Sequence, residues 1–338
     1  MNKAVIVRMG GEIGIKSKNV RRIYENKVIN NIMKILKRNN ISFSKILKYP
    51  GRVYLFTEEN EKAAELIAKI FGVYSTSTCF VLSSDMKEII DKTLEIVLTK
   101  LKPGTFAIRC RRTGSHSYKS KDIEVVLGRA ILEKRSDLKV NLDNPDQVIN
   151  IEIRDEYAYV YFDSIKGPDG FPLGTQNPLI GIINETKESV IASWCVMRRG
   201  VEIKVLICGE FSENIKSNIK HLLQWIPNGI IEVYKVNTEC KSRIFEILAA
   251  IKLAKIEKID GIVSGIRNID IELIKKLLRF NVSIFFPLIA LEDEMIRDWC
   301  KYLSLGEYVI NKELIKEDLK EISLEEEINY EIIKFPYS

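Results

Sequence analysis

Two stretches of the chain carry side chains suited to contact a polyanion. The first, residues 10–22, is a glycine-containing turn followed by four cations within seven residues: Lys16, Lys18, Arg21 and Arg22. Glycines at 10, 11 and 14 allow a backbone to approach a ligand closely, and lysine and arginine contact phosphates. The alternative is a solvated loop and helix start, and this stretch alone does not separate the two.

The second stretch, residues 106–124, begins as a strand. Residues i and i+2 of a strand share one face, so Arg109 and Arg111 align while Ile108 and Cys110 face the other way. Cations interleaved with an aromatic side chain suit RNA, at a single-stranded end or along a helical backbone. The remaining candidate contacts follow on a flexible turn: Arg112, His116, Tyr118, Lys119 and Lys121. No carboxylate or nucleophile accompanies His116 in sequence, which favours a loop contact over a catalytic base.

A third stretch, residues 180–197, has the frame of a nucleotide site without its usual loop. An apolar strand end, Ile180–Ile183, and a helix, Val190–Met197, flank the run Asn-Glu-Thr-Lys-Glu-Ser at 184–189. An anion site at a helix N-terminus needs glycines that let the backbone approach the ligand. This run has no glycine and carries two carboxylates, so it suggests a nucleotide frame that has been altered.

The charge of the 338-residue chain is unevenly spread, although the net charge is only +6. Residues 1–50 hold twelve Lys or Arg against two acids, and residues 100–140 hold eleven against four. Residues 311–338 hold four Lys against eight acids. Two basic segments in one half favour a nucleic-acid partner over a merely solvated surface.

Cysteine usage and hydropathy bear on the compartment. The six cysteines are scattered and form no C-x-x-C pair, so neither a metal site nor a disulfide framework is expected. No apolar run approaches the ~20 residues of a membrane span, and the N-terminus lacks the apolar core of a signal peptide. We therefore expect a cytoplasmic protein without a membrane partner.

The periodicity of apolar residues predicts the elements that position these stretches. Residues 1–75 and 76–165 each read as a small α+β unit, and the Gly/Pro-dense segment 166–178 reads as a linker. Residues 179–310 alternate strand and helix, which predicts a doubly wound parallel α/β sheet. Beyond Ile310 we expect a charged tail, helical or disordered, at 311–338.

Several motifs together resemble the tRNA 4-thiouridine synthetase (tRNA sulfurtransferase) family over nearly the whole chain. GEIGIKSKN is similar to its N-terminal ferredoxin-like domain, and FAIRCRR…YKSKDIEVVLGRAI with VNLDNPD is similar to its THUMP domain, an RNA-binding module. FFPLIALEDEMIRDWCKYLSLGEYVI resembles the late segment of its nucleotide-binding PP-loop domain. The resemblance implies binding of tRNA by its acceptor end and use of ATP to activate a uridine for sulfur transfer.

The resemblance also shows where this chain departs from the family. The family's pyrophosphate loop reads Ser-Gly-Gly-x-Asp-Ser; here only Ser189 matches, Glu188 replaces Asp, and Lys187 offers a direct phosphate contact. A later Thr-Gly-Glu segment is replaced by Ser264-Gly265-Ile266-Arg267, which lacks the Glu. No cofactor is therefore expected, and ATP with Mg²⁺ binds only if the divergent loop still holds it.

A sulfur-relaying cysteine precedes a helix in the family, and Cys240 stands in the comparable place. Lys241, Arg243 and the helix N-terminus would lower its pKa, whereas an inert, half-buried thiol is the alternative. Family likeness further suggests a homodimer and a sulfur-carrier or tRNA-modifying partner protein.

Four functions remain open at this point. The first is a tRNA-binding protein with a non-functional ATP site, and the second is an active sulfurtransferase with a divergent loop. A THUMP-bearing methyltransferase is disfavoured, because no Gly-rich loop of a methyl-donor site follows any strand. A structural protein without an RNA partner is the fourth.

Overall fold

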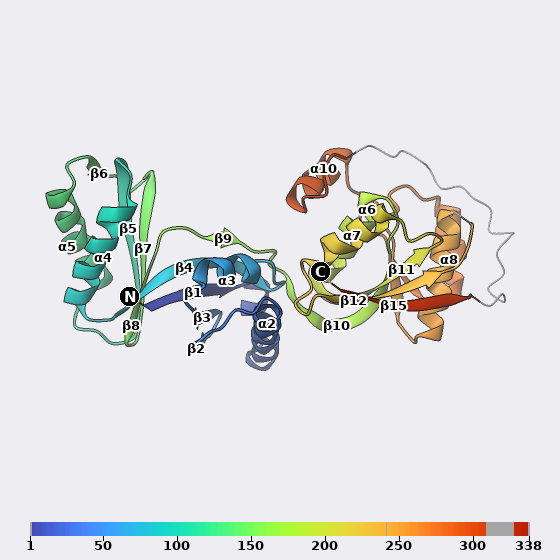
Figure 1. Ribbon diagram of the computed structural model, residues 1–338, viewed down its shortest axis with the longest axis horizontal. Coiled ribbons are helices and arrows are strands. Elements are labelled where there is room, and N and C mark those ends of the chain that lie inside the picture. The colour runs from blue at the N-terminus through green and yellow to red at the C-terminus, as the bar shows by residue number, and fades with distance from the viewer. Residues whose placement is uncertain (1, 241, 309–327, 337–338) are drawn as a thin grey trace. The chain divides into compact units, whose positions relative to one another are not determined.

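The computed structural model describes residues 2–240, 242–308 and 328–336. Contacts divide the chain into two compact units (Figure 1). The N-terminal unit comprises Met1–Met9, Asn40–Ala68 and Tyr74–Gly167, and the C-terminal unit comprises Gly10–Asn39, Lys69–Val73 and Pro168–Ser338. None of the helices in the described ranges is both long and apolar enough to cross a bilayer.

The N-terminal unit is built on one sheet in the order β2-β3-β1-β4-β8-β7-β5-β6, with β9 paired to β4. Its strands are β1 (Asn2–Met9), β2 (Lys45–Tyr49), β3 (Arg52–Phe56), β4 (Val73–Ser83), β5 (Gly104–Thr113), β6 (Leu138–Val140), β7 (Gln147–Arg154), β8 (Tyr157–Tyr161) and β9 (Ile165–Lys166). Its helices are α3 (Asn60–Ile67), α4 (Met86–Lys100) and α5 (Ser120–Lys134). Strands β7 and β8 pair antiparallel and form a hairpin.

This sheet is strongly curved. The rings of Tyr54 on β3 and Tyr159 on β8 stack with centroids 4.1 Å apart, although β1 and β4 lie between those strands. Neighbouring strands are about 4.8 Å apart, so a flat sheet would hold the two rings much farther from each other. Tyr54 also donates a hydrogen bond of 2.6 Å to the buried carboxylate of Glu152 on β7. The curvature therefore packs the two halves of the unit against each other.

The C-terminal unit contains a six-stranded sheet in the order β14-β13-β10-β11-β12-β15. Its strands are β10 (Phe171–Ile182), β11 (Arg199–Cys208), β12 (Ile230–Val236), β13 (Gly261–Val263), β14 (Ser283–Phe285) and β15 (Tyr330–Pro336). Its helices are α1 (Gly11–Gly14), α2 (Lys18–Arg38), α6 (Lys187–Met197), α7 (Glu213–Leu223), α8 (Arg243–Ile256), α9 (Ile271–Leu277) and α10 (Asp293–Tyr302), with a 3₁₀ turn at Leu278–Phe280.

Helices cover both faces of this sheet. Val205 and Ile207 of β11 belong to a core with α6, α7 and α10, whereas Leu206 belongs to a second core with α8 and α9. Successive side chains of a strand point to opposite faces, so buried residues on both faces require cover on both. All neighbouring strands pair in parallel except β15, which runs antiparallel to β12. The expected doubly wound α/β sheet is confirmed.

Two local expectations differ from the structure. The segment 166–178, expected to be a linker, is largely strand: β10 starts at Phe171 and pairs with β11 through two register shifts. Pro172 and Pro178 fit there because β13 pairs with β10 only at Ile180 and Gly181, so the earlier part of β10 has an open edge.

The expectation of helix or disorder beyond Ile310 is wrong for Tyr330–Pro336, which form β15. Pairing along the whole of β12, from Val236 opposite Tyr330 to Ile230 opposite Pro336, holds this strand in place. The rest of the expected tail, apart from residues 328 and 329, lies outside the described residues.

Candidate nucleic-acid interface and nucleotide site

Strand β5 presents two arginines on its solvent side. Arg109 and Arg111 are exposed, whereas Ile108 and Cys110, which alternate with them, are buried in the core under α4 and α5. Arg109 donates a hydrogen bond to the carbonyl of Leu142, and Arg111 makes no hydrogen bond or ion pair with the described residues. The alternation expected from sequence is present, and it leaves at least one guanidinium free for a ligand.

The turn after β5 is held by a histidine side chain. Arg112 can only donate, so His116 accepts at Nδ1 across 3.3 Å. The Nε2 atom of the same ring lies 2.8 Å from the carbonyl oxygen of Asp155, which can only accept. Both ring nitrogens of His116 are thus engaged with the chain, and the side chain holds the loop in place.

Tyr118 does not have the exposed ring that the sequence suggested. It is only 9% exposed, belongs to the core under α4 and α5, and donates to the carbonyl of Ser84. Lys119 is exposed, and the side chain of Lys121 lies 3.2 Å from Glu124. The helix begins at Ser120, and its N-cap is Lys119. The turn thus offers cations but no stacking aromatic.

The basic segment at residues 10–22 lies in the C-terminal unit, where α1 replaces the expected open turn. Lys18 and Arg22 are exposed on the first turns of α2 and make no hydrogen bond or ion pair within the described ranges. Arg21 lies 3.9 Å from Glu25, and the ammonium of Lys16 sits 5.0 Å from the centre of the Phe171 ring.

Gly10 has an internal reason to be glycine. A Cβ there would lie 1.9 Å from the Asp169 carboxylate, so the close approach that this glycine permits is to the chain itself. Gly11 and Gly14 have open space beside them. Of the three glycines expected to approach a ligand, two remain candidates.

The topology of the C-terminal sheet marks a second place for a ligand. Strands β10 and β13 are neighbours, and from them the strand order runs in opposite directions along the chain. Doubly wound sheets bind ligands at the carboxyl ends of the strands at such a switch point. The loop after β10, residues 183–186, and the loop after β13, from Ser264, meet there. The altered run 184–189 therefore lies where a nucleotide would bind.

The loop after β10 is satisfied by its own polar groups. The side chain of Asn184 accepts from the backbone and hydroxyl of Thr186 at 3.1 and 2.7 Å. Asn218 of α7 donates to the Asn184 carbonyl at 2.7 Å. The hydroxyl of Ser189 donates to the Thr186 carbonyl, also at 2.7 Å. The one family residue that remains here thus holds the first turn of α6.

A buried carboxylate occupies that first turn. Glu188 is 7% exposed and accepts a 2.7 Å hydrogen bond from the hydroxyl of Tyr308. That hydroxyl accepts in turn from Arg267 at 2.9 Å, and Arg267 also contacts Asp293 at 2.5 Å and the Leu291 carbonyl at 2.6 Å. Burial and the bond to Glu188 raise the pKa of Tyr308 to about 12. A negative charge at a helix N-terminus is favourable, and at α6 the carboxylate of Glu188, rather than a ligand, occupies that position.

The loop after β13 closes the same space. A Cβ on Gly265 would lie 2.5 Å from the carbonyl carbon of Glu188 and 2.6 Å from the amide nitrogen of Ser189. The two backbones are therefore in direct contact at the start of α6. The side chain of Lys187, a partly buried residue at the start of α6, donates to the carbonyl of Glu307. We refer to Lys187, Glu188, Gly265, Arg267 and Tyr308 as the switch-point cluster.

Cys240 is exposed in the loop before α8, as its expected role requires. Its backbone amide donates to the Thr238 hydroxyl at 3.0 Å, and Ser242 caps the helix. Arg243 lies 3.4 Å from the buried carboxylate of Glu246, so that guanidinium is engaged elsewhere. Burial raises the pKa of Glu246, and Arg243 and a hydrogen bond from Asn184 oppose the rise. Lys241 lies outside the described residues.

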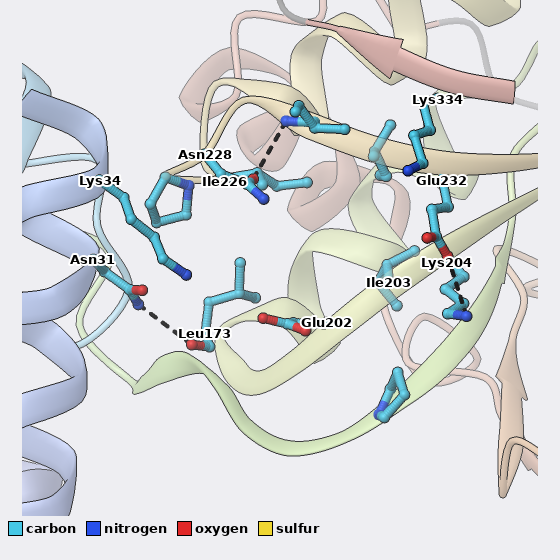
Figure 2. Close-up of a pocket in the computed structure, with 14 residues that line it drawn as sticks. Asn31, Lys34, Leu173, Glu202, Ile203, Lys204, Ile226, Asn228, Glu232 and Lys334 are labelled. Atoms are coloured by element: carbon cyan, nitrogen blue, oxygen red, sulfur yellow. Dashed lines mark hydrogen bonds and ion pairs between the residues drawn. The ribbon is translucent and has the colours of Figure 1, made fainter. Parts of the chain in front are cut away.

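A cavity of about 390 Å³ lies at the opposite ends of the strands (Figure 2). Lys34 of α2 and Glu202 of β11 line it, and Lys204 pairs with Glu232 at 3.1 Å. Figure 2 also shows Asn31 bonded to the carbonyl of Leu173 on one wall. Glu202 and Glu232 lie near the starts of β11 and β12, far from the carboxyl ends where such sheets bind nucleotides. The cavity is lined by both lysine and glutamate side chains, which does not favour binding of a polyphosphate.

Comparison with known proteins identifies the family. The ThiI ferredoxin-like domain matches residues 4–77, and the THUMP domain matches residues 83–163. A probable tRNA sulfurtransferase of Methanosarcina mazei is 31% identical over 91% of this chain and 83% of its own length. This chain belongs to the tRNA sulfurtransferase family. The match to the Methanosarcina acetivorans relative is 34% identical, but it spans 69% of this chain and 59% of that protein.

A solved structure supports the fold of the family member. A 4-thiouridine synthetase, crystallised as an RNA complex with bound ATP, superposes with a TM-score of 0.74. The match covers 90% of this chain and 85% of that one at 21% identity, so it bears on the fold alone. Both the ferredoxin-like and THUMP domains expected from the motifs are confirmed by the domain matches.

Sequence reasoning missed part of the switch-point cluster. Tyr308 lies 120 residues from Glu188 in sequence, and no local pattern marks it as a partner. Asn218 of α7 donates to the same loop, and no local sequence pattern marks it as a partner either. Arg267 was named only as the last residue of the segment Ser264-Gly265-Ile266-Arg267, which lacks the family's Glu. Arg267 holds the hydrogen-bond network together, because it donates to three different acceptors.

Proposed function

We propose that this chain is a tRNA-binding member of its family, that it holds tRNA for thiolation by a partner, and that its switch-point site does not bind ATP. The observation that carries the proposal is the buried Glu188 carboxylate at the start of α6, where a phosphate would need to lie. ATP would bring further negative charge beside that carboxylate. Like charges brought together in a partly buried site repel strongly.

The backbone contact at Gly265 supports the same conclusion. A phosphate that used the amide of Ser189 would have to displace the loop after β13, whose Gly265 lies against that amide. Displacement would also separate Arg267 from Asp293 and Tyr308. Breaking this partly buried ionic network costs about 1–2 kcal/mol, which lowers any affinity for ATP roughly tenfold.

The other half of the proposal, binding of tRNA, is supported by exposed cations on both units. The THUMP domain carries Arg109 and Arg111 on the outer side of β5, and Lys18 and Arg22 are exposed on α2. Unpaired cations of this kind bind nucleic-acid phosphates through counterion release. The family resemblance supplies the substrate class, which is tRNA and its acceptor end.

Isothermal titration of the full chain with ATP and magnesium tests the ATP half. We expect no binding heat up to millimolar ATP, while filter binding to tRNA gives an affinity that weakens steeply with salt. A micromolar Kd for ATP that Lys187→Ala abolishes would overturn the proposal.

One observation favours a second candidate, an active ATP-dependent sulfurtransferase with a divergent loop. Cys240 is exposed in a loop at the carboxyl edge of the C-terminal sheet, next to the α8 N-terminus. The test is thiolation of tRNA by the purified protein with ATP, magnesium and a sulfur donor, compared with Cys240→Ser. Thiolation that depends on Cys240 would replace the first proposal with the second.

A further inference from the structure

All three tryptophans of the chain gather in one aromatic cluster of the C-terminal unit. The ring of Trp194 on α6 lies 5.4 Å from that of Trp225 and 4.9 Å from that of Trp299 on α10. Phe71 packs beneath, 5.5 Å from Trp194, and both of these residues are 1% exposed. Phe71 and Trp194 thus form a buried floor.

The outer layer of the cluster is open to solvent. Trp225 and Trp299 are half-buried, and Tyr302 at the end of α10 is 49% exposed. The rings of Trp225 and Tyr302 stack with centroids 6.1 Å apart and planes only 28° from parallel. Exposed apolar surface costs about 25 cal/mol per Å². Buried Phe71 and Trp194 hold the Trp225–Tyr302 pair in place at the surface. Another aromatic ring that stacked on this pair would remove apolar surface from water.

The surroundings of this pair are mainly cationic. Lys69 donates to Gln224, directly before Trp225, at 3.2 Å. Arg198 follows Trp194 by one helical turn, and its backbone amide donates to the Trp194 carbonyl at 2.9 Å. Lys301, next to Tyr302, has a side chain 79% exposed and lies 3.3 Å from Asp298. Cationic residues therefore lie on several sides of the cluster, and they favour an anionic partner.

We propose that Trp225 and Tyr302 form a stacking platform for an unpaired base of a single-stranded RNA segment. Sequence-tolerant single-strand sites combine aromatic rings, on which bases stack, with cations that track the backbone. The cationic rim favours RNA over an apolar protein surface. The inference rests on the proposed function only in that the ligand is RNA. It assigns an RNA contact in the C-terminal unit that is separate from the β5 face of the N-terminal unit.

Intrinsic fluorescence gives a direct test, because every tryptophan of the protein lies in this cluster. The full chain is titrated with an eight-nucleotide oligouridylate and with an abasic strand of the same length and charge, at low salt. We expect saturable quenching by the oligouridylate and weak or no quenching by the abasic strand. Tyr302→Ala should weaken oligouridylate binding about tenfold or more, and Tyr302→Phe should retain it.

Tyr74→Ala is the matched control, because Tyr74 is 55% exposed in the N-terminal unit, and it should bind as the unaltered protein does. Thermal unfolding of each variant checks that the fold is intact. Equal quenching by the abasic strand, or full affinity in Tyr302→Ala, would overturn the platform. If tRNA still binds on filters while oligouridylate causes no quenching, the platform alone fails and the aromatic pair is left for a protein contact. If tRNA does not bind either, the proposed function fails as well.

Discussion

Strand β5 and the switch-point edge of the C-terminal sheet both carry arginine or lysine, but they use the charges in opposite ways. On β5, Arg109 and Arg111 point to solvent, and Arg111 has no partner among the described residues. At the switch point, Arg267 is engaged by Asp293, Tyr308 and a carbonyl. Exposed cations can contact a ligand, whereas cations that bond to other groups of the protein stabilise its fold. The difference distinguishes exposed cations that can contact a ligand from cations that hold the fold together.

The largest expected effect is on stability. Arg267→Ala removes three bonds and leaves the buried Glu188–Tyr308 pair without its cation, so we expect the C-terminal unit to lose about 3 kcal/mol of unfolding free energy. Urea denaturation followed by tryptophan fluorescence measures this, since all tryptophans lie in that unit. Arg279→Ala, at an exposed arginine of the same unit, is the control and should change little. An Arg267→Ala protein as stable as the control would contradict a structural role.

The next effect is on RNA affinity. Reversing both exposed charges of β5, as Arg109→Glu with Arg111→Glu, should weaken tRNA binding about 50-fold and reduce the salt dependence. The charge-matched control is Lys62→Glu with Lys87→Glu, at two exposed positions of the same unit. Filter binding across a salt series compares the two proteins. Equal losses in both would mean that only net charge matters, and the β5 face would lose its assignment.

A pH series tests the ionic cluster that joins the halves of the N-terminal unit. Burial would raise the pKa of Glu152, but hydrogen bonds from Tyr54 and Arg154 and the charge of Arg52 outweigh it and hold the pKa below its ordinary value. Its stabilisation is therefore complete above the ordinary pKa of 4.5 and is lost as the pH falls through the depressed one. Glu152→Gln should cost about 2 kcal/mol at pH 7.

The cost of Glu152→Gln should shrink below pH 4.5, where the carboxyl group of the unfolded chain takes up a proton, and it should vanish once the pH has fallen through the lower pKa of the native carboxyl group. This unit contains no tryptophan, so denaturation is followed by circular dichroism or by hydrogen exchange in β7 and β8. A cost that stays constant from pH 7 to pH 3 would show that the charge of Glu152 is unimportant.

The smallest effect is expected at Lys187. Its ammonium is exposed and its bond to the Glu307 carbonyl is solvated, so Lys187→Met should change the unfolding free energy by about 0.5 kcal/mol or less. The same change should leave tRNA affinity unaltered. A large loss of tRNA affinity would join Lys187 to the RNA surface and blur the distinction between the two regions.

Local periodicity explains what could be predicted from the sequence. The alternation of Arg109 and Arg111 with buried neighbours depends only on the two-residue repeat of a strand, and the structure has it. Tyr118 was misjudged because its burial depends on Ser84, 34 residues earlier, which no local pattern shows. The strand β15 was missed for a similar reason, since pairing with β12 rather than its own charged sequence holds it in place.

The switch-point cluster shows the same limit. The absence of glycines at 184–189 was visible in sequence, and it directed attention to the start of α6. What fills the space was not visible, because Glu188 is joined to Tyr308 over 120 residues. Absence of a motif can be seen in one segment, whereas the contacts that take its place require the whole fold.

Binding of ATP and of tRNA, measured on one preparation of the full chain, tests the central claim most directly. We predict tRNA binding that weakens steeply with salt, together with no calorimetric signal for ATP and magnesium up to millimolar concentration. Micromolar ATP binding that Lys187→Ala removes would contradict the claim that the switch-point cluster has replaced the nucleotide.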